Sequence, residues 1–230
     1  MRPIPIAALL ALVLAACAPP VTRPPEATPQ APVGFPEGRY LDLAAQGRPV
    51  FRVDGARSLV VVEVHRAGSL ARVGHDHVIA AHGITGYIAP DEGRADLYAR
   101  LEDLAVDEPD LRAAAKLDTH PSSEDIAGTR RNMLTGLDSA QYPFAAVHVS
   151  GVLGRDGETP LDVALAIHGV TQVRHVPVRT QRAGDELTAT GRMTLKQTDF
   201  GMKPLSLLGG ALQVQDEFEL RFTIRARRVR

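Results

Sequence analysis

Cysteine and aromatic residues are scarce in this sequence of 230 residues. It has one cysteine, Cys17, no tryptophan, six phenylalanines and four tyrosines. A single cysteine excludes an internal disulfide and a cysteine-rich metal site, and its modification would leave no catalytic thiol. An interior with so few aromatic side chains must be built mostly from Val, Leu, Ile and Ala.

The chain also lacks an excess of charge and the common catalytic motifs. Its 26 Lys and Arg residues nearly balance its 27 Asp and Glu residues, so no basic surface points to nucleic acid. No H-E-x-x-H zinc motif, G-x-S-x-G nucleophile motif or phosphate-binding loop occurs in the sequence. We therefore expect a binding protein rather than an enzyme, with no cofactor, no catalytic residue and no nucleic-acid partner.

No apolar run is long enough to cross a bilayer, and the N-terminal run predicts export instead. Arg2 is followed by an apolar stretch from Ile4 to Leu14, which is shorter than the roughly 20 residues of a membrane-spanning helix. A charged start, an apolar stretch and small residues before a cleavage point form an export signal. The sequence Leu-Ala-Ala-Cys at residues 14–17 resembles the bacterial lipobox, so we expect residues 1–16 to be removed and Cys17 to carry lipid. A plain signal peptide followed by an incidental cysteine is the alternative.

The segment after the cysteine predicts a location and a spacer. Ala18 rather than Asp follows Cys17, which resembles lipoproteins of the outer membrane, so we expect a periplasmic protein anchored to that membrane. Residues 17–38 cannot bury enough apolar surface to offset the entropy of ordering them. We expect them to be a linker that joins the lipid to one domain, residues 39–230. The linker is punctuated by Pro19, Pro20, Pro24, Pro25, Pro29, Pro32 and Pro36.

Alternation of apolar and polar residues with a period of two dominates the domain. The clearest run spans residues 212–225, and similar runs span residues 187–196, 161–167 and 97–101. A β-branched run covers residues 60–64, and Ile84 and Ile88 mark a further strand. Such alternation predicts an antiparallel sheet with one face on a core.

The period changes between Val106 and Tyr142. Residues 111–117 and 126–137 read as short helices, and Ser122 or Ser123 is expected to cap the second. A sheet with one apolar face must close on itself or pair with a second sheet. We expect a mainly β fold, an antiparallel barrel of about eight strands with one short helical excursion. A β-sandwich is the alternative.

Short stretches across residues 48–230 resemble the YceI-like family in their order and spacing. The family includes polyisoprenoid-binding periplasmic proteins, so the resemblance implies a lipocalin-like barrel and an apolar, isoprenoid-like ligand. The stretch Gly74-His75-Asp76-His77 departs from the better-known members. The matching stretches are Arg57 to Val62, Gly86 to Asp91, Arg131 to Leu134 leading into Tyr142-Pro143, Leu165 to Thr171, Thr198 to Gly201, and Val214 to Asp216.

A barrel of about eight strands either is filled by its own side chains or holds one small ligand. Walls of aliphatic residues leave room for a ligand and would bind a lipid chain by removing it from water, at roughly 25 cal/mol per Å² buried. With the family resemblance, this predicts a carrier, storage or sensing role. The predicted ligand-binding residues are Val60, Val62, Val64, Ile84, Ile88, Leu97, Leu101, Leu165, Ile167, Met193, Phe218 and Phe222.

One acidic residue stands out among these strands. Asp216 shares the strand parity of Val214 and Phe218, so it is expected to point inward. A buried carboxylate is costly without partners. It would therefore either anchor a ligand head group or pair with an arginine or with backbone N–H groups.

A His-x-His pair, His75 and His77, supports an alternative function. On a strand the two side chains share one face, and His65 or His82 would supply the third ligand that a zinc site needs. The other interpretation is a hydrogen-bonded cluster at the barrel rim, in which Asp76 and the histidines satisfy one another and nearby backbone. The alternative function is thus a metal-dependent protein or enzyme centred on the pair.

Overall fold

The computed structural model describes residues 31–151, 153 and 156–230. The predicted signal peptide (residues 1–16), Cys17 and the first part of the predicted linker lie outside the described residues. Within the described part of the chain, no helix is both long and apolar enough to span a membrane.

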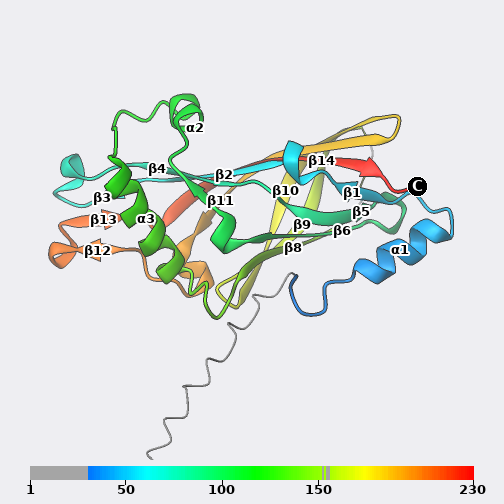
Figure 1. Ribbon diagram of the computed structural model, residues 1–230, viewed down its shortest axis with the longest axis horizontal. Coiled ribbons are helices and arrows are strands. Elements are labelled where there is room, and N and C mark those ends of the chain that lie inside the picture. Colours follow the sequence, from blue (N-terminus) through cyan, green and yellow to red (C-terminus); the bar gives the residue numbers. More distant parts are fainter. Residues whose placement is uncertain (1–30, 152, 154–155) are drawn as a thin grey trace, which may run out of the picture.

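Eight antiparallel strands of the described chain close into a barrel (Figure 1). The ring is closed by pairing between its first and last strands, which joins Phe51 to Arg228 and Val53 to Ala226. This confirms the predicted mainly β barrel. In order around the ring, the strands are β1 (Phe51–Val53), β5 (Thr85–Ala89), β6 (Arg94–Arg100), β8 (Phe144–Ser150), β9 (Gly157–Ile167), β10 (Val170–Ala183), β11 (Glu186–Lys196) and β14 (Glu217–Arg228).

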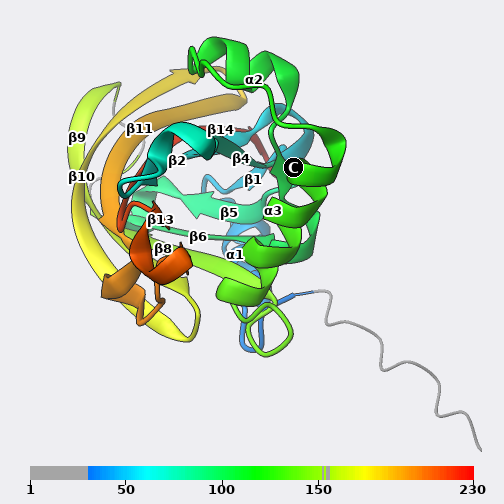
Figure 2. The ribbon, with the colours of Figure 1, turned by 90° about the vertical axis from the view of Figure 1, so that its left-hand side faces the viewer.

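A branch of the sheet leaves the ring at β14, because this long strand pairs with two partners on one edge. Its last residues pair with β1, whereas its middle pairs with β2 (Leu59–Val64), joining Leu220 to Val62. The branch continues through β4 (His77–Ala81) to β7 (Ala105–Val106). The helix α3 (Ser123–Gly136) contacts β7. Figure 2 looks along the barrel from the side of α3 and shows the strands arranged in a ring with α3 beside it.

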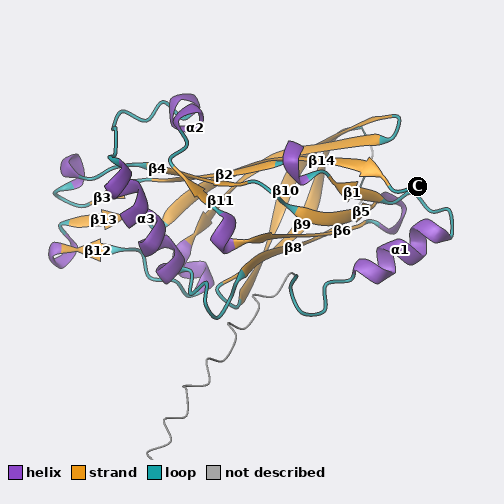
Figure 3. Cartoon of the chain, viewed as in Figure 1, coloured by secondary structure: helices purple, strands orange, loops and turns teal. Residues whose placement is uncertain are grey.

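Smaller elements lie at both ends of the barrel (Figure 3). A small sheet of β12 (Ser206–Leu207), β13 (Leu212–Val214) and β3 (Arg66–Ala67) lies at the same end as α3, whereas α1 (Glu37–Ala45) lies at the opposite end. The helix α2 (Pro109–Ala114) precedes α3. Short 3-10 helices occupy connections: η1 (Gly55–Arg57), η2 (Ala71–Val73), η3 (Pro90–Glu92), η4 (Leu101–Asp103), η5 (Gln197–Phe200) and η6 (Leu208–Gly210).

The helical excursion follows the signals in its sequence. Helices α2 and α3 begin two and three residues before their predicted starts, at Pro109 and Ser123. The N-cap of α3 is Ser122, whose Oγ accepts a hydrogen bond from the Asp125 N–H, while the Asp125 carboxylate accepts one from the Ser122 N–H. This reciprocal capping box satisfies two backbone donors that the first turn of a helix leaves free. The predicted cap at Ser122 or Ser123 is therefore confirmed at Ser122.

The helix α1 has no counterpart among the predicted elements and begins at Glu37, inside the segment predicted as linker. It is held by tertiary contacts of Tyr40, which is fully buried, stacks on Tyr87 and donates a hydrogen bond to Asp96 (2.6 Å). Phe35, just before the helix, packs edge-on against Tyr98. A helix of nine residues is too short to be stable alone, so its position depends on these contacts.

The predicted continuous strand over residues 212–225 is wrong in one place. The chain bends at Gln215 and Asp216, which separates β13 from β14. The two parts then pair with different partners, β13 with β3 and β14 with β2. This bend moves Asp216 off the alternating register that its predicted orientation assumed.

Candidate ligand cavity

The barrel encloses a cavity of about 540 Å³. This lies within the roughly 300–1,000 Å³ that small-molecule sites usually occupy. Its wall is mostly aliphatic because each strand turns one of its two faces inward. Val60, Val62 and Val64 of β2 line it and are partly buried, and Val60 and Val62 also pack against clusters of buried residues.

All twelve residues predicted to bind the ligand line this cavity. Some of them also belong to the packed core: Ile84, Ile88 and Leu97 lie in one cluster of buried residues, and Leu165 and Phe218 in another. The structure therefore places the predicted set on one continuous wall. Contact of these residues with a ligand stays a prediction. The set comprises Val60, Val62, Val64, Ile84, Ile88, Leu97, Leu101, Leu165, Ile167, Met193, Phe218 and Phe222.

The residues at the end of the cavity beside α3 and the small sheet are not among those predicted from the sequence. Thr129, Asn132 and Met133 of α3 line the cavity, as do Leu205 and Val214 near the small sheet. Periodicity shows which face of a strand is apolar, but it does not show where a helix packs. The sequence predicts a helix over residues 126–137, but it does not predict where this helix packs against the barrel.

A polar group lies at the start of β4. His77 lines the cavity, and its side chain is 14% exposed. Its Nδ1 lies 2.6 Å from Oδ2 of Asp107, whose side chain is fully buried. Its Nε2 lies 3.4 Å from the Thr129 hydroxyl on α3. The ring is thus held on one side by a buried carboxylate and faces α3 on the other.

Three hydrogen-bond donors surround the carboxylate of Asp107. The Val78 N–H donates to Oδ1 (3.1 Å), Nη1 of Arg112 donates to the same oxygen (2.5 Å), and His77 contacts Oδ2. Burial acts to raise the pKa of this carboxyl, but the hydrogen bonds from His77, Arg112 and Val78 outweigh burial and lower the pKa. Asp107 is therefore a carboxylate at neutral pH.

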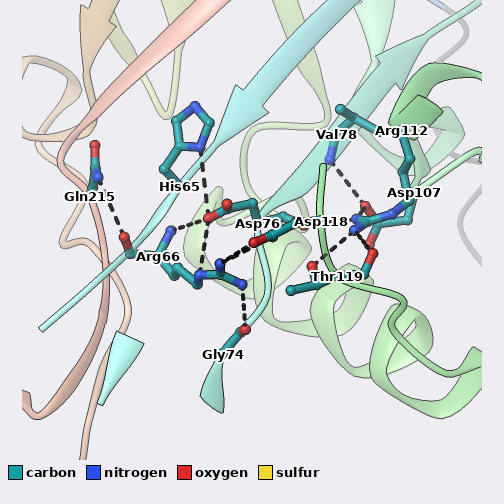
Figure 4. A network of polar contacts seen from close by, with 10 residues as sticks. All are labelled: His65, Arg66, Gly74, Asp76, Val78, Asp107, Arg112, Asp118, Thr119 and Gln215. Carbon is teal, nitrogen blue, oxygen red and sulfur yellow. Dashed lines mark hydrogen bonds and ion pairs between the residues drawn. The ribbon is translucent and has the colours of Figure 1, made fainter. Parts of the chain in front are cut away.

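A wider network holds the loop before β4 in place (Figure 4). Arg112 also donates to the Asp76 carbonyl (2.7 Å) and to Thr119. Asp76 accepts the Arg66 N–H (2.8 Å), and the Arg66 guanidinium reaches the Gly74 carbonyl (3.0 Å) and Asp118. Because the contacts come from both sides of the loop, they fix the direction in which the His77 ring enters the cavity.

The prediction that Asp76 and the two histidines hydrogen-bond to one another is wrong. His77 pairs with Asp107, and the nearest acidic group to His75 is Asp125, at 3.9 Å. Nδ1 of His75 is buried and has no hydrogen-bond partner in the described chain. The sequence did not reveal Asp107, because it lies 30 residues after His77 and only the pairing of β4 with β7 brings it close.

The proposed third metal ligands point elsewhere. His65 lies 3.7 Å from Asp76, and His82 lies 2.9 Å from Glu108. Over residues 31–151, 153 and 156–230, no three His, Cys, Asp or Glu side chains come together as a metal site. The structure therefore does not assemble the metal centre that the alternative function required.

Asp216 does not point into the cavity. Its carboxylate accepts hydrogen bonds from the Thr198 N–H (2.9 Å) and the Thr198 hydroxyl (2.6 Å). These bonds lower the pKa of the carboxyl, the one from the hydroxyl contributing most. Of the two interpretations of Asp216, the structure supports pairing with backbone rather than contact with a head group.

Comparison with known proteins gives one family and a set of similar folds. A family model of the YceI-like domain matches residues 54–226. A polyisoprenoid-binding domain from Saccharophagus degradans, implicated in plant cell wall breakdown, superposes with a TM-score of 0.57 at 16% identity, covering 78% of this chain and 98% of that chain. BcnA of Burkholderia cenocepacia gives a TM-score of 0.49 at 17% identity, with 75% and 98% covered. No curated protein matches the sequence. At these identities the first structure shows a shared fold and nothing finer.

Proposed function

The chain belongs to the YceI-like family, and from this premise we propose that it binds one apolar, isoprenoid-like lipid inside the barrel. The observation that carries the proposal is the cavity of about 540 Å³ with its aliphatic wall. The Saccharophagus degradans domain of the same fold, described as polyisoprenoid-binding, supports the choice of ligand class.

The wall explains how such a lipid would be held. Each Å² of apolar surface removed from water contributes roughly 25 cal/mol. A lipid tail that buries about 300 Å² therefore gains on the order of 7 kcal/mol of binding free energy, before the cost of association is subtracted. This mechanism selects the length and width of the chain. A carrier, storage or sensing role fits it better than catalysis does.

We further propose that the protein works in the periplasm while anchored to the outer membrane. The support is in the sequence, in the lipobox-like residues 14–17 and in Ala18 after the cysteine. The linker would let the domain reach lipids near the membrane surface while staying tethered.

Native mass spectrometry of the full chain purified from membranes tests ligand binding. We expect a species heavier than the lipidated protein by the mass of one apolar lipid, which is lost on mild activation. The variant Val62→Arg, which places an unpaired charge on the wall, should lack this species and lose several kcal/mol of stability. A wild-type protein that carries no lipid and takes none up from added prenyl lipids would contradict the proposal.

A further inference from the structure

The position of His77 in its strand is the starting point. Residues two apart in a strand project from the same face, and Ile79 and Ala81 of β4 line the cavity together with His77. An imidazole therefore occupies a place in the wall where the pattern of the strand would put an aliphatic side chain.

Asp107 determines which nitrogen of the ring is available. An ionised carboxylate only accepts hydrogen bonds, so Nδ1 of His77, 2.6 Å from Oδ2, must carry the hydrogen of this contact. In the neutral ring Nε2 is then an acceptor.

The groups facing Nε2 come from α3. The Thr129 hydroxyl lies 3.4 Å from Nε2, longer than the usual hydrogen bond to a hydroxyl. Asn132 lies three residues further along the helix, hence on the same side, and also lines the cavity. An acceptor nitrogen, a hydroxyl and an amide are therefore grouped where β4 faces α3.

We propose that His77 is a head-group site, at which Nε2 accepts a hydrogen bond from the terminal hydroxyl of a long apolar alcohol whose chain fills the cavity. Thr129 and Asn132 supply donors to the oxygen of the same hydroxyl. The inference rests on the proposed function, because it concerns the polar end of the lipid bound there.

The charges around the cavity favour an alcohol over an anion or an ether. Among the residues of the described chain that line it, Lys203 is the one permanent cation, and its side chain is exposed at the surface. Arg112 is occupied by Asp107 and Thr119. With Lys203 as the one lysine or arginine of the described chain that lines the cavity, a phosphate or carboxylate would find few of the charged partners it requires inside an apolar wall. An ether has no hydrogen to donate to Nε2.

Two probes of nearly equal size test the assignment: farnesol and farnesyl methyl ether, in which a methyl group replaces the hydroxyl hydrogen. The affinity for each probe is measured by displacement of the fluorescent dye N-phenyl-1-naphthylamine from the purified full chain. We expect the wild type to bind farnesol up to about tenfold more tightly than the ether, because the ether cannot donate the hydrogen bond to Nε2. In His77→Leu the ratio should fall to about one, whereas Val173→Leu, a change at an exposed position of β10 that does not line the cavity, should keep the wild-type ratio.

The variant Asp107→Asn tests the positioning role of the carboxylate. The asparagine amide can donate to Nδ1, which would move the ring hydrogen to Nε2 and remove the acceptor. We expect this variant to bind the dye and to lose the preference for farnesol. A preference that survives in Asp107→Asn would overturn the positioning role.

The outcomes separate the head-group assignment from the proposed function. Equal binding of farnesol and its ether by the wild type, or an unchanged ratio in His77→Leu, would overturn the assignment while lipid binding stands. Tighter binding of farnesyl phosphate than of farnesol, dependent on His77, would overturn the choice of a hydroxyl. If the wild type binds none of the three apolar probes, the dye, farnesol and the hydrocarbon farnesene, the proposed function itself fails.

Discussion

Asp107 stabilises both the loop before β4 and the part of the cavity wall at His77. Its backbone adopts a positive φ of 57°, a conformation that aspartate and asparagine tolerate better than most residues. In this conformation its N–H donates to the Val78 carbonyl (2.8 Å) and its side chain accepts the Val78 N–H. The same carboxylate holds His77 and Arg112. One side chain thus joins β4, α2 and the polar end of the cavity.

The lowered pKa of Asp107 gives stability a defined pH dependence. The ordinary pKa is 3.8 and the folded-state pKa lies below it, so the contribution is complete above 3.8 and is lost as the pH falls through the folded-state pKa. We expect Asp107→Asn to lower the free energy of unfolding by roughly 2 kcal/mol at pH 5. Urea titrations from pH 5 to pH 2.5 should show this deficit narrowing as wild-type Asp107 takes up its proton.

An exposed carboxylate provides the control for this series. Asp91 is half-exposed and lies 3.9 Å from Arg48, so Asp91→Asn should change stability by less than about 0.5 kcal/mol at every pH. An Asp107→Asn deficit that stays constant down to pH 2.5 would mean that ionised Asp107 does not stabilise the fold.

At the scale of elements, α1 is an addition held against the outside of the barrel. Asp96 of β6 receives the Tyr40 hydroxyl, Nε of Arg94 (2.7 Å) and Nδ1 of His148 (2.8 Å). Glu37 at the start of the helix accepts a hydrogen bond from the Tyr87 hydroxyl (2.6 Å). The family match starts at residue 54 and so leaves out α1 and β1. Yet β1 closes the ring, and α1 packs beside the strand that β1 pairs with, β5.

Tyr40→Phe should weaken the attachment of α1 while leaving its packing. The lost bond joins a buried hydroxyl to a carboxylate, and such bonds contribute about 1.5–3 kcal/mol. We expect a loss of about 2 kcal/mol in urea unfolding and faster amide hydrogen exchange within α1. The control is Tyr142→Phe. The Tyr142 hydroxyl accepts a hydrogen bond from the exposed Gln141, so its removal should lower the free energy of unfolding by less than about 0.5 kcal/mol. Equal losses in the two variants would contradict the anchoring role of Tyr40.

At the scale of the whole molecule, the proposed arrangement is a tethered binding domain. Cys17→Ala should release the protein from the membrane into the soluble periplasmic fraction without unfolding the domain, because the predicted linker would separate the lipid from the barrel. Cell fractionation followed by thermal melting of the released protein measures both effects. A variant that stays on the membrane after a high-salt wash would contradict anchoring through this cysteine.

The parts of this molecule that the sequence predicts are those encoded by local pattern. Alternation identifies Leu165 and Phe222 as inward-facing, a β-branched run marks the strand that contains Val62, and a Ser-x-x-Asp signal identifies the start of α3. The pairing of His77 with Asp107 depends on the position of β7, and no local pattern encodes it. The same holds for α1, which is short and acquires its stability from Asp96 and Tyr87.

Two phenylalanine substitutions distinguish binding of the lipid inside the barrel from binding on its surface. Leu165 is buried and lines the cavity, whereas Val173 of β10 is 56% exposed on the outer face. Native mass spectrometry of wild type, Leu165→Phe and Val173→Phe purified from membranes compares the fraction of protein that carries lipid. Binding inside the barrel predicts that Leu165→Phe stays folded with a clearly reduced lipid-bound fraction and that Val173→Phe matches the wild type. Equal lipid content in all three proteins would contradict it.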